Sequence, residues 1–197
     1  MRNVFFIVGP TATGKSEIAA DVAREIGAEI VNADAFQIYE GFEVLSAKPD
    51  ATTLAKAPHH LVGTMSVSEE MSAARFRERA LMAIAEIHLR GNLPIVVGGS
   101  GLYIKALTHG LSSAPAPDPD LRARLNDLSL AALQKRLTAL DPEAANKIDW
   151  KNRRRLVRAL EICLLSGEPA SKQRTNWKVV EAAVLSGKSL KGGTRCQ

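Results

Sequence analysis

Eight consecutive residues near the N-terminus have the composition of a phosphate-binding loop. They read Gly-Pro-Thr-Ala-Thr-Gly-Lys-Ser and match the pattern G-x-x-x-x-G-K-[ST] at every defined position. In such a loop the glycines let backbone N–H groups turn toward phosphate oxygens, Lys15 neutralises the terminal phosphates, and the Ser16 hydroxyl ligates Mg²⁺. We therefore expect a phosphate site, with Mg²⁺ as cofactor, formed by Gly9, Pro10, Thr11, Ala12, Thr13, Gly14, Lys15 and Ser16.

Asp34 is a second residue whose side chain could take part in chemistry. Asp34 comes directly after a short strand expected at 29–32, and loops at the carboxyl ends of parallel strands surround the ligand site. A carboxylate beside bound phosphate is unfavourable unless it binds the metal or accepts a proton from a nucleophile. An aspartate that caps a turn is the alternative. Phosphate binding alone does not distinguish a nucleotide kinase, an ATPase and a transferase that acts on a diphosphate.

The surrounding pattern predicts an α/β core with a parallel sheet. Strands are expected at 4–8, 29–32 and 93–97. The strand at 4–8 is a continuous apolar run, which predicts that other elements of the fold pack on both of its faces. A helix is expected at 16–26, and the segment 34–67 is expected to be mostly loop. In the helix expected at 16–26, apolar residues recur at every fourth position, namely Ile18, Val22 and Ile26. A second helix, capped at Ser66 or Ser72, is expected along Phe76, Ala80, Ala83 or Ile84, and Ile87.

The second half of the sequence changes character at a proline-rich segment. Residues 114–119 contain three prolines, and only helical signals follow as far as Leu165. The apolar stripes expected there are Leu121, Leu125 and Leu128, then Leu133, Leu137 and Leu140, then Leu156, Leu160 and Leu164. These signals divide the chain into an α/β core over 1–112, a helical domain over 113–177 and a tail over 178–197.

Composition excludes several classes of protein. The 197 residues are 46% hydrophobic and 24% charged, which is typical of globular proteins and not of disordered or collagen-like chains. Two cysteines are too few for a disulfide framework, which favours a reducing compartment. The longest apolar run near the N-terminus has five residues, so we expect no membrane segment and no signal peptide.

Positive charge gathers in the second half. Residues 1–110 carry a net −2 and residues 111–197 a net +7, which suggests a polyanionic partner for the helical domain. The densest cluster includes Arg154 and Arg158 on an expected helix. A solvated basic face, or ion pairs with Glu161 and Asp149, is the alternative. The adjacent pair at 59–60, two histidines, is expected to pack or form hydrogen bonds rather than to bind a metal.

Beyond the loop, a set of ordered blocks gives a more specific indication. These blocks are 34–41 (Asp-Ala-Phe-Gln-Ile-Tyr-Glu-Gly), 47–49 (Ala-Lys-Pro), 57–61 (Ala-Pro-His-His-Leu), 98–107 (Gly-Gly-Ser-Gly-Leu-Tyr-Ile-Lys-Ala-Leu), 141–145 (Asp-Pro-Glu-Ala-Ala) and 154–161 (Arg-Arg-Leu-Val-Arg-Ala-Leu-Glu). Together with the loop they resemble the tRNA dimethylallyltransferases, also called tRNA isopentenyltransferases or IPP transferases. The resemblance covers about residues 1–177 in family order. It implies a P-loop NTPase-like parallel sheet core with a small all-helical insertion domain.

The resemblance implies roles for individual residues. In that family the loop holds the diphosphate of dimethylallyl diphosphate, Thr13 lies near the leaving oxygen, and Asp34 is the general base that accepts a proton from the adenine N6 amine. The implied catalytic set is therefore Asp34, Thr13 and Lys15. Expected tRNA contacts are Asp34, Ala35, Phe36, Gln37, Ser100 and Arg122 from the resemblance, with Arg154 and Arg158 added from the basic cluster. The implied partners are the tRNA anticodon stem-loop and dimethylallyl diphosphate, bound by a cytoplasmic monomer.

The chain also departs from the family pattern. Ala35 and Ser46 stand where a serine and a threonine are usual, and residues from Lys178 onward do not match. Family members continue well beyond Trp177, and that portion normally adds core helices and an arginine for the diphosphate. Two readings besides the prenyltransferase therefore stay open: a tRNA-binding form with weak turnover, and a P-loop nucleotide or small-molecule kinase.

Overall fold

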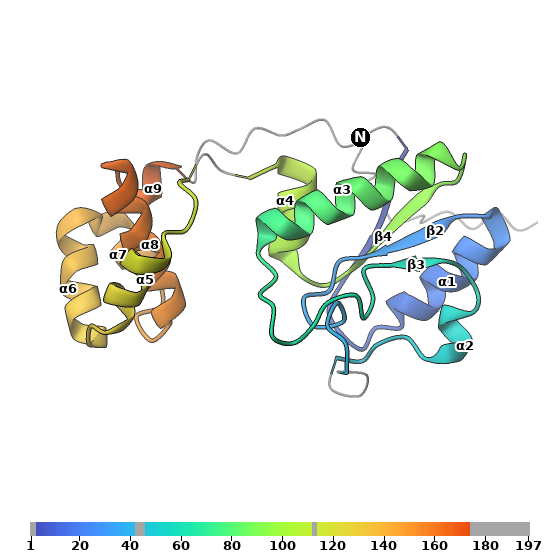
Figure 1. The fold of residues 1–197 in the computed structure, drawn as a ribbon, viewed down its shortest axis with the longest axis horizontal. Helices are drawn as coiled ribbons and strands as arrows, with labels where there is room; N and C mark the ends of the chain where they lie inside the picture. Colours follow the sequence, from blue (N-terminus) through green and yellow to red (C-terminus); the bar gives the residue numbers. More distant parts are fainter. Residues whose placement is uncertain (1–2, 42–45, 112–113, 174–197) are drawn as a thin grey trace, which may run out of the picture. The chain divides into compact units, whose positions relative to one another are not determined.

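The structure, a computed structural model, describes residues 3–41, 46–111 and 114–173. Within these residues the chain forms two compact units that divide between Gly110 and Leu111 (Figure 1). Each unit has its own apolar core, and each is described separately below. The tail expected at 178–197 and Trp177 lie outside the described residues.

A four-stranded parallel sheet forms the centre of the first unit, as the sequence predicted. Its order is β1-β4-β2-β3, with β1 at Phe5–Val8, β4 at Pro94–Gly98, β2 at Glu29–Asn32 and β3 at His59–His60. The helices are α1 at Lys15–Ile26, α2 at Ala51–Leu54, α3 at Ala73–Leu89 and α4 at Gly101–His109. Because all strands run parallel, their carboxyl ends meet at one edge of the sheet.

Helices cover both faces of this sheet (Figure 1). On one face α3 and α4 pack in a cluster with Val31 and Val96, and on the other α1 packs against Ile30 and Ile95. The predicted helix at 16–26 is confirmed, but its predicted apolar stripe is wrong. Ile18, Val22 and Ile26 are exposed, and the buried residues of α1 are Ala19, Ala20 and Ala23. Small side chains let the helix lie close to the sheet.

Two further expectations for this unit are corrected. Strand β1 is covered only in part: Phe6 packs into the cluster of α3 and α4 and Ile7 into that of α1, whereas Phe5 and Val8 are 46% and 52% exposed. It pairs with β4 alone among the described strands. The segment 34–67 is less irregular than expected, because it contains α2 and β3. Of the two candidate caps for α3, Ser72 is the one used, since its side chain accepts a hydrogen bond from the backbone N–H of Arg75 at 3.2 Å.

The second unit consists of helices, as predicted, among its described residues. They are α5 at Pro119–Asn126, α6 at Leu130–Leu140, α7 at Pro142–Lys147, α8 at Arg153–Ser166 and α9 at Ala170–Gln173. Leu140 and Leu164 are exposed, contrary to the predicted stripes. In the stripe of α8, each four-residue step rotates by about 40° around the helix, so Leu164 leaves the buried face. Leu140 is instead the last residue of α6. No described helix is long and apolar enough to cross a membrane.

A buried carboxylate, Glu29, links three segments of the first unit. Glu29 accepts two hydrogen bonds from Arg90 at 2.8 and 2.7 Å and one from Asn92 at 2.9 Å, and it pairs with His60 at 2.7 Å. The hydrogen bonds from Arg90 outweigh the effect of burial and lower the pKa of Glu29 to about 2. Glu29 therefore links β2, β3 and the segment after α3 as a charged group.

The depressed pKa of Glu29 predicts acid sensitivity of the first unit. A carboxylate with a lowered pKa in the folded state stabilises the fold above its unfolded pKa of roughly 4.3, and this contribution is lost as the pH falls toward the folded value. In urea unfolding followed by circular dichroism, we expect Glu29→Gln to lower the free energy of unfolding at pH 7 by an amount of the order of 3 kcal/mol. The difference between variant and parent should shrink toward pH 2. A difference independent of pH would contradict this assignment.

Candidate functional site

The phosphate-binding loop has the backbone that its glycines predict. It connects β1 to α1, and Gly14 adopts a left-handed conformation with φ of 73° directly before the helix. No side chain caps the N-terminus of α1, so its first backbone N–H groups stay available for an anion. Thr13 Oγ1 donates a hydrogen bond to the carbonyl oxygen of Pro10 at 3.0 Å, and the Lys15 ammonium donates to the same oxygen. The lysine therefore lies over the loop.

Hydrogen bonds on two sides hold the acidic loop that follows β2. Asn32 is buried, its Oδ1 accepts from the backbone N–H of Asp34 at 3.1 Å, and its amide donates to the carbonyl oxygen of Leu61 at 2.9 Å. On the other side, the backbone N–H of Ala35 donates to Ser100 Oγ at 2.8 Å. Asp34 also caps its own turn, since its Oδ1 accepts from the backbone N–H of Phe36 at 2.9 Å. The Asp34 side chain is thus fixed, with Oδ2 as the oxygen left for other partners.

Lys15 and Asp34 line one cavity. It has a volume of about 210 Å³ and lies at the carboxyl edge of the sheet. Its lining comprises Thr11, Ala12, Thr13, Gly14, Lys15, Ser16, Glu17, Asp34, Gln37, Ala47, Lys48, Pro49, Thr53, Val97 and Gly98. The structure therefore brings together most of the loop residues predicted from the sequence and the predicted base, which an open parallel sheet does through the shared edge of its strands.

Close backbone contact between two strand ends creates this proximity. Gly98 ends β4, and an ideal Cβ on it would lie 2.3 Å from the carbonyl carbon and oxygen of Ala33. The backbone N–H of Ala33 donates to the carbonyl oxygen of Val97 at 2.7 Å, and that of Ser100 donates to Ala33 at 3.3 Å. A side chain at position 98 would push the Asp34 loop away from β4. Position 98 therefore requires glycine because any Cβ would collide with the backbone of Ala33, and not because of an unusual φ.

Four residues expected near the substrate take different positions. Phe36 is 70% exposed, so its ring is available for stacking. Gln37 is buried, and its amide donates to the carbonyl oxygens of Ser46 and Ala47 at 3.3 and 2.9 Å, which supports the loop after it. Ser100 holds the acidic loop, and Ala35 supplies the backbone N–H that it binds.

Sequence reasoning assigned no role to two residues that the structure places at the site. Lys48 lines the cavity as a second cation, and its signal was the Ala-Lys-Pro block in a loop that follows Asp34. Asn32 orients Asp34, and its signal in the sequence was an amide at the end of a strand, two residues before an aspartate.

Tyr103, whose ring stacks on Phe76 at 4.2 Å, stays protonated, because burial and the charges of Tyr39 and Asp34 raise its pKa to about 12.

The residues fit a magnesium ion that is held mainly by substrate oxygens. Mg²⁺ usually takes one or two protein oxygens together with phosphate oxygens and water, and Ser16 offers a hydroxyl at the start of α1 inside the cavity. No group of three or more His, Cys, Asp or Glu suited to a metal occurs in the described part of the chain. His60 pairs with Glu29, and His59 Nδ1 contacts the carbonyl oxygen of Ala57 at 2.7 Å.

The predicted arginines of the second unit differ in their surroundings. Arg154 is exposed on α8. Arg122 and Arg158 instead form ion pairs with Glu161 at 2.8 and 2.6 Å. For Arg158 this is the internal pairing that the sequence left open for the basic cluster. Both keep about a third of their side-chain surface exposed.

Comparisons with known proteins point to one family. The family described as IPP transferase matches residues 37–189. The match extends past Lys178, so the expectation that the resemblance ends at about residue 177 is wrong. A tRNA dimethylallyltransferase of Anaeromyxobacter sp. is 48% identical over 174 residues, and one of Citrifermentans bemidjiense is 45% identical over 172. These matches cover 86% and 87% of this chain but 58% and 56% of the relatives. The chain thus spans little more than half the length of these relatives.

Solved structures give the same result. A eukaryotic dimethylallyltransferase acting on tRNA matches with a TM-score of 0.75 and 29% identity, over 89% of this chain and 45% of that one. The full-length tRNA isopentenylpyrophosphate transferase of Bacillus halodurans matches with a TM-score of 0.57 and 38% identity, over 86% of this chain and 57% of that one.

The contact at Gly98 predicts a specific sensitivity to a single methyl group. We expect Gly98→Ala to lower the free energy of unfolding by about 1–3 kcal/mol, as in other overpacked sites, and to displace the Asp34 loop from β4. Thermal unfolding and amide chemical shifts of residues 33–36 would measure both effects. Gly101→Ala is the matched control, because nothing lies within 4 Å of a Cβ built there. If the two variants were equally stable, the claim that the contact with Ala33 excludes a side chain at position 98 would be wrong.

Proposed function

The chain belongs to the IPP transferase family, and on this premise we propose that it transfers a dimethylallyl group from dimethylallyl diphosphate to N6 of the adenosine 3′-adjacent to the tRNA anticodon. One observation carries the proposal: Lys15 and Asp34 line the same cavity. A cation that holds a leaving diphosphate and a carboxylate that accepts a proton are the two groups that this transfer needs. The relatives' names agree with it.

The loop is proposed to bind the donor. Backbone N–H groups at the start of α1, with the ammonium of Lys15 and the Thr13 hydroxyl, would hold the diphosphate oxygens. Ser16 would hold Mg²⁺, which supplies charge neutralisation of the leaving diphosphate when bound. Lys48 also lines the cavity and would add a second positive charge to it. These contacts strengthen as negative charge develops on the leaving oxygen.

Asp34 is proposed as the general base. The N6 amine attacks the allylic carbon, the N–C bond forms, and the C–O bond to the diphosphate breaks, so its electron pair leaves with the diphosphate. The attacking nitrogen becomes positively charged and releases a proton to Asp34 Oδ2. Since Oδ1 accepts from the backbone N–H of Phe36, the carboxylate is oriented before the substrate binds.

The remaining residues are proposed to hold tRNA. The exposed ring of Phe36 is suited to stack on a base near the target, because unpaired RNA bases stack on aromatic side chains. Asp34, Ala35, Gln37 and Ser100 shape the same rim, and the basic residues Arg122, Arg154 and Arg158 face the anticodon stem-loop. We further propose that the chain acts as a monomer in the cytoplasm.

A labelled donor tests the proposal directly. With radiolabelled dimethylallyl diphosphate and an anticodon stem-loop RNA, we expect label on adenine and a loss of about 10²- to 10⁴-fold in rate for Asp34→Asn, the usual contribution of a general base. Asp127→Asn, an exposed aspartate at the end of α5, is the control of equal charge change.

The outcomes separate the readings that the sequence left open. RNA binding without transfer at high protein concentration would favour the tRNA-binding form with weak turnover. ATP consumption that depends on an acceptor, without prenyl transfer, would favour a kinase, since the loop alone suits either donor. Transfer unaffected by Asp34→Asn would remove Asp34 from the mechanism.

Phe36 gives a second test of the same site. If its ring stacks on the RNA, Phe36→Ala should weaken stem-loop binding by about 1–3 kcal/mol, the usual value for one stacked base. Phe36→Tyr should retain the affinity because it keeps the stacking surface. Binding would be followed by fluorescence anisotropy of a labelled stem-loop. Because the ring is 70% exposed, the free energy of unfolding should change little, and an unchanged affinity in Phe36→Ala would exclude stacking.

A further inference from the structure

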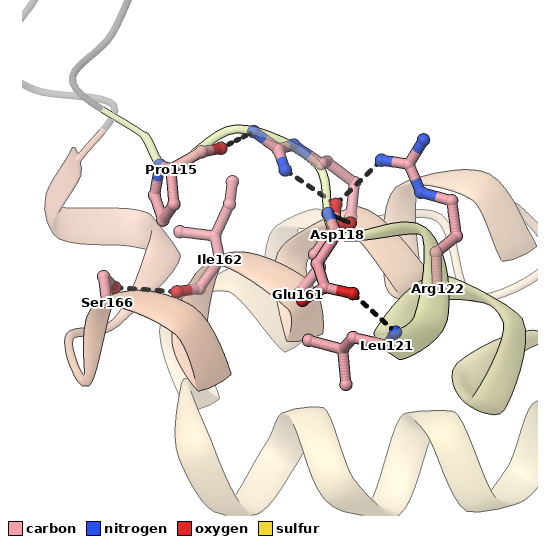
Figure 2. A network of polar contacts seen from close by, with 8 residues as sticks. Pro115, Asp118, Leu121, Arg122, Glu161, Ile162 and Ser166 are labelled. Atoms are coloured by element: carbon pink, nitrogen blue, oxygen red, sulfur yellow. Dashed lines mark hydrogen bonds and ion pairs between the residues drawn. The ribbon is translucent and has the colours of Figure 1, made fainter.

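One buried carboxylate in the second unit binds two arginines through a single oxygen. Glu161 on α8 has no exposed surface. Its Oε2 accepts hydrogen bonds from Arg122 at 2.8 Å and from Arg158 at 2.6 Å, and its Oε1 accepts from the backbone N–H of Asp118 at 2.9 Å. Figure 2 shows this network, with Arg122 reaching it from α5. Both carboxylate oxygens are therefore paired.

The network fixes the start of α5 against α8. Burial raises the pKa of Glu161, but the hydrogen bonds from Arg158 and Arg122 outweigh it, so the net pKa lies below its ordinary value and the group is charged. Arg158 also donates to the carbonyl oxygen of Pro115 at 2.7 Å. Since Asp118 caps α5, these contacts determine where Arg122 stands one turn later.

The ion pairs of this network join two cations to one anion. Two guanidinium groups thus share one carboxylate as their ion-pair partner, and neither makes an ion pair with any other acidic residue within the described part of the chain. The two side chains are 35% and 33% exposed. The carboxylate of Asp118 caps α5 by accepting from the backbone N–H of Leu121, and it forms no ion pair with either arginine.

Arg122 donates to Glu161 through Nη2 alone, and Arg158 uses one N–H of each terminal nitrogen, for Glu161 and for Pro115. Since a guanidinium group has five N–H donors, both arginines keep donors for a phosphate oxygen.

We propose that Glu161 is a positioning residue that holds Arg122 and Arg158 side by side as a binding site for one backbone phosphate of RNA. Two like charges separate unless an anion lies between them, and the buried carboxylate provides that anion before RNA arrives. Fixing the side chains beforehand lowers the ordering cost of binding. The inference rests on the proposed function, because tRNA is the partner that would supply the phosphate.

The salt dependence of binding tests whether the two arginines share a phosphate. With a fluorescent anticodon stem-loop and the full chain, each of Arg122→Gln and Arg158→Gln should reduce the slope of log affinity against log salt by about 0.7 to 0.9, the value for one phosphate. The double variant should lose no more than either single one. Arg124→Gln, which removes the same charge two residues further along α5, is the control and should leave the slope unchanged.

Glu161→Gln separates positioning from charge. It adds one positive charge to the protein, so charge alone predicts tighter RNA binding, whereas loss of positioning predicts weaker binding. Far-UV circular dichroism and thermal unfolding show whether the variant is folded. If it is not, the arginine variants decide the question by themselves.

Each result points one way. A double variant that loses twice the slope of the single variants, or single variants and Arg124→Gln with equal effects, would overturn the shared phosphate site while leaving RNA binding intact. Tighter binding by folded Glu161→Gln would overturn the positioning role. If the unaltered chain does not bind the stem-loop at all, the proposed function fails, and this inference fails with it.

Discussion

The candidate site depends on how closely the carboxyl ends of three parallel strands approach. Gly98 at the end of β4 touches the backbone of Ala33 after β2, and the backbone N–H of Gly9 after β1 lies 3.4 Å from the Gly98 carbonyl oxygen. These contacts bring the phosphate-binding loop and the Asp34 loop to one cavity, although 19 positions separate Lys15 from Asp34 in the sequence. Strand register thus supplies a geometry that neither loop could hold alone.

Two buried acidic residues show how charge is used away from the cavity. Glu29 forms hydrogen bonds with Arg90, Asn92 and His60, and it links β2, β3 and the segment after α3. Glu161 forms ion pairs with two arginines. Removing one partner of a buried ion pair is costly, so both residues constrain their surroundings. The ion pairs of Glu161 hold two partly exposed arginines with one carboxylate, and we therefore assign these arginines a role in binding an anion.

The sequence predicted the parts of the site whose geometry is local. The loop conformation follows from glycines at fixed spacing, and the position of Asp34 follows from its place after a strand. Other features depend on packing between distant segments. The pairing of Arg122 with Glu161 joins residues 39 positions apart, and the buried alanine face of α1 depends on how near the helix lies to the sheet. Leu140 and Leu164 were misplaced because regular spacing indicates a helix more reliably than its buried face.

A structure with an unreactive thio-analogue of dimethylallyl diphosphate would test the central claim most directly. We expect the diphosphate group on the backbone N–H groups of residues 11–16, with Lys15 in contact and the allylic carbon directed toward the side of the cavity where Asp34 lies. A diphosphate bound outside this cavity, or an allylic carbon directed away from Asp34, would contradict the claim that one cavity holds both the leaving group and the base.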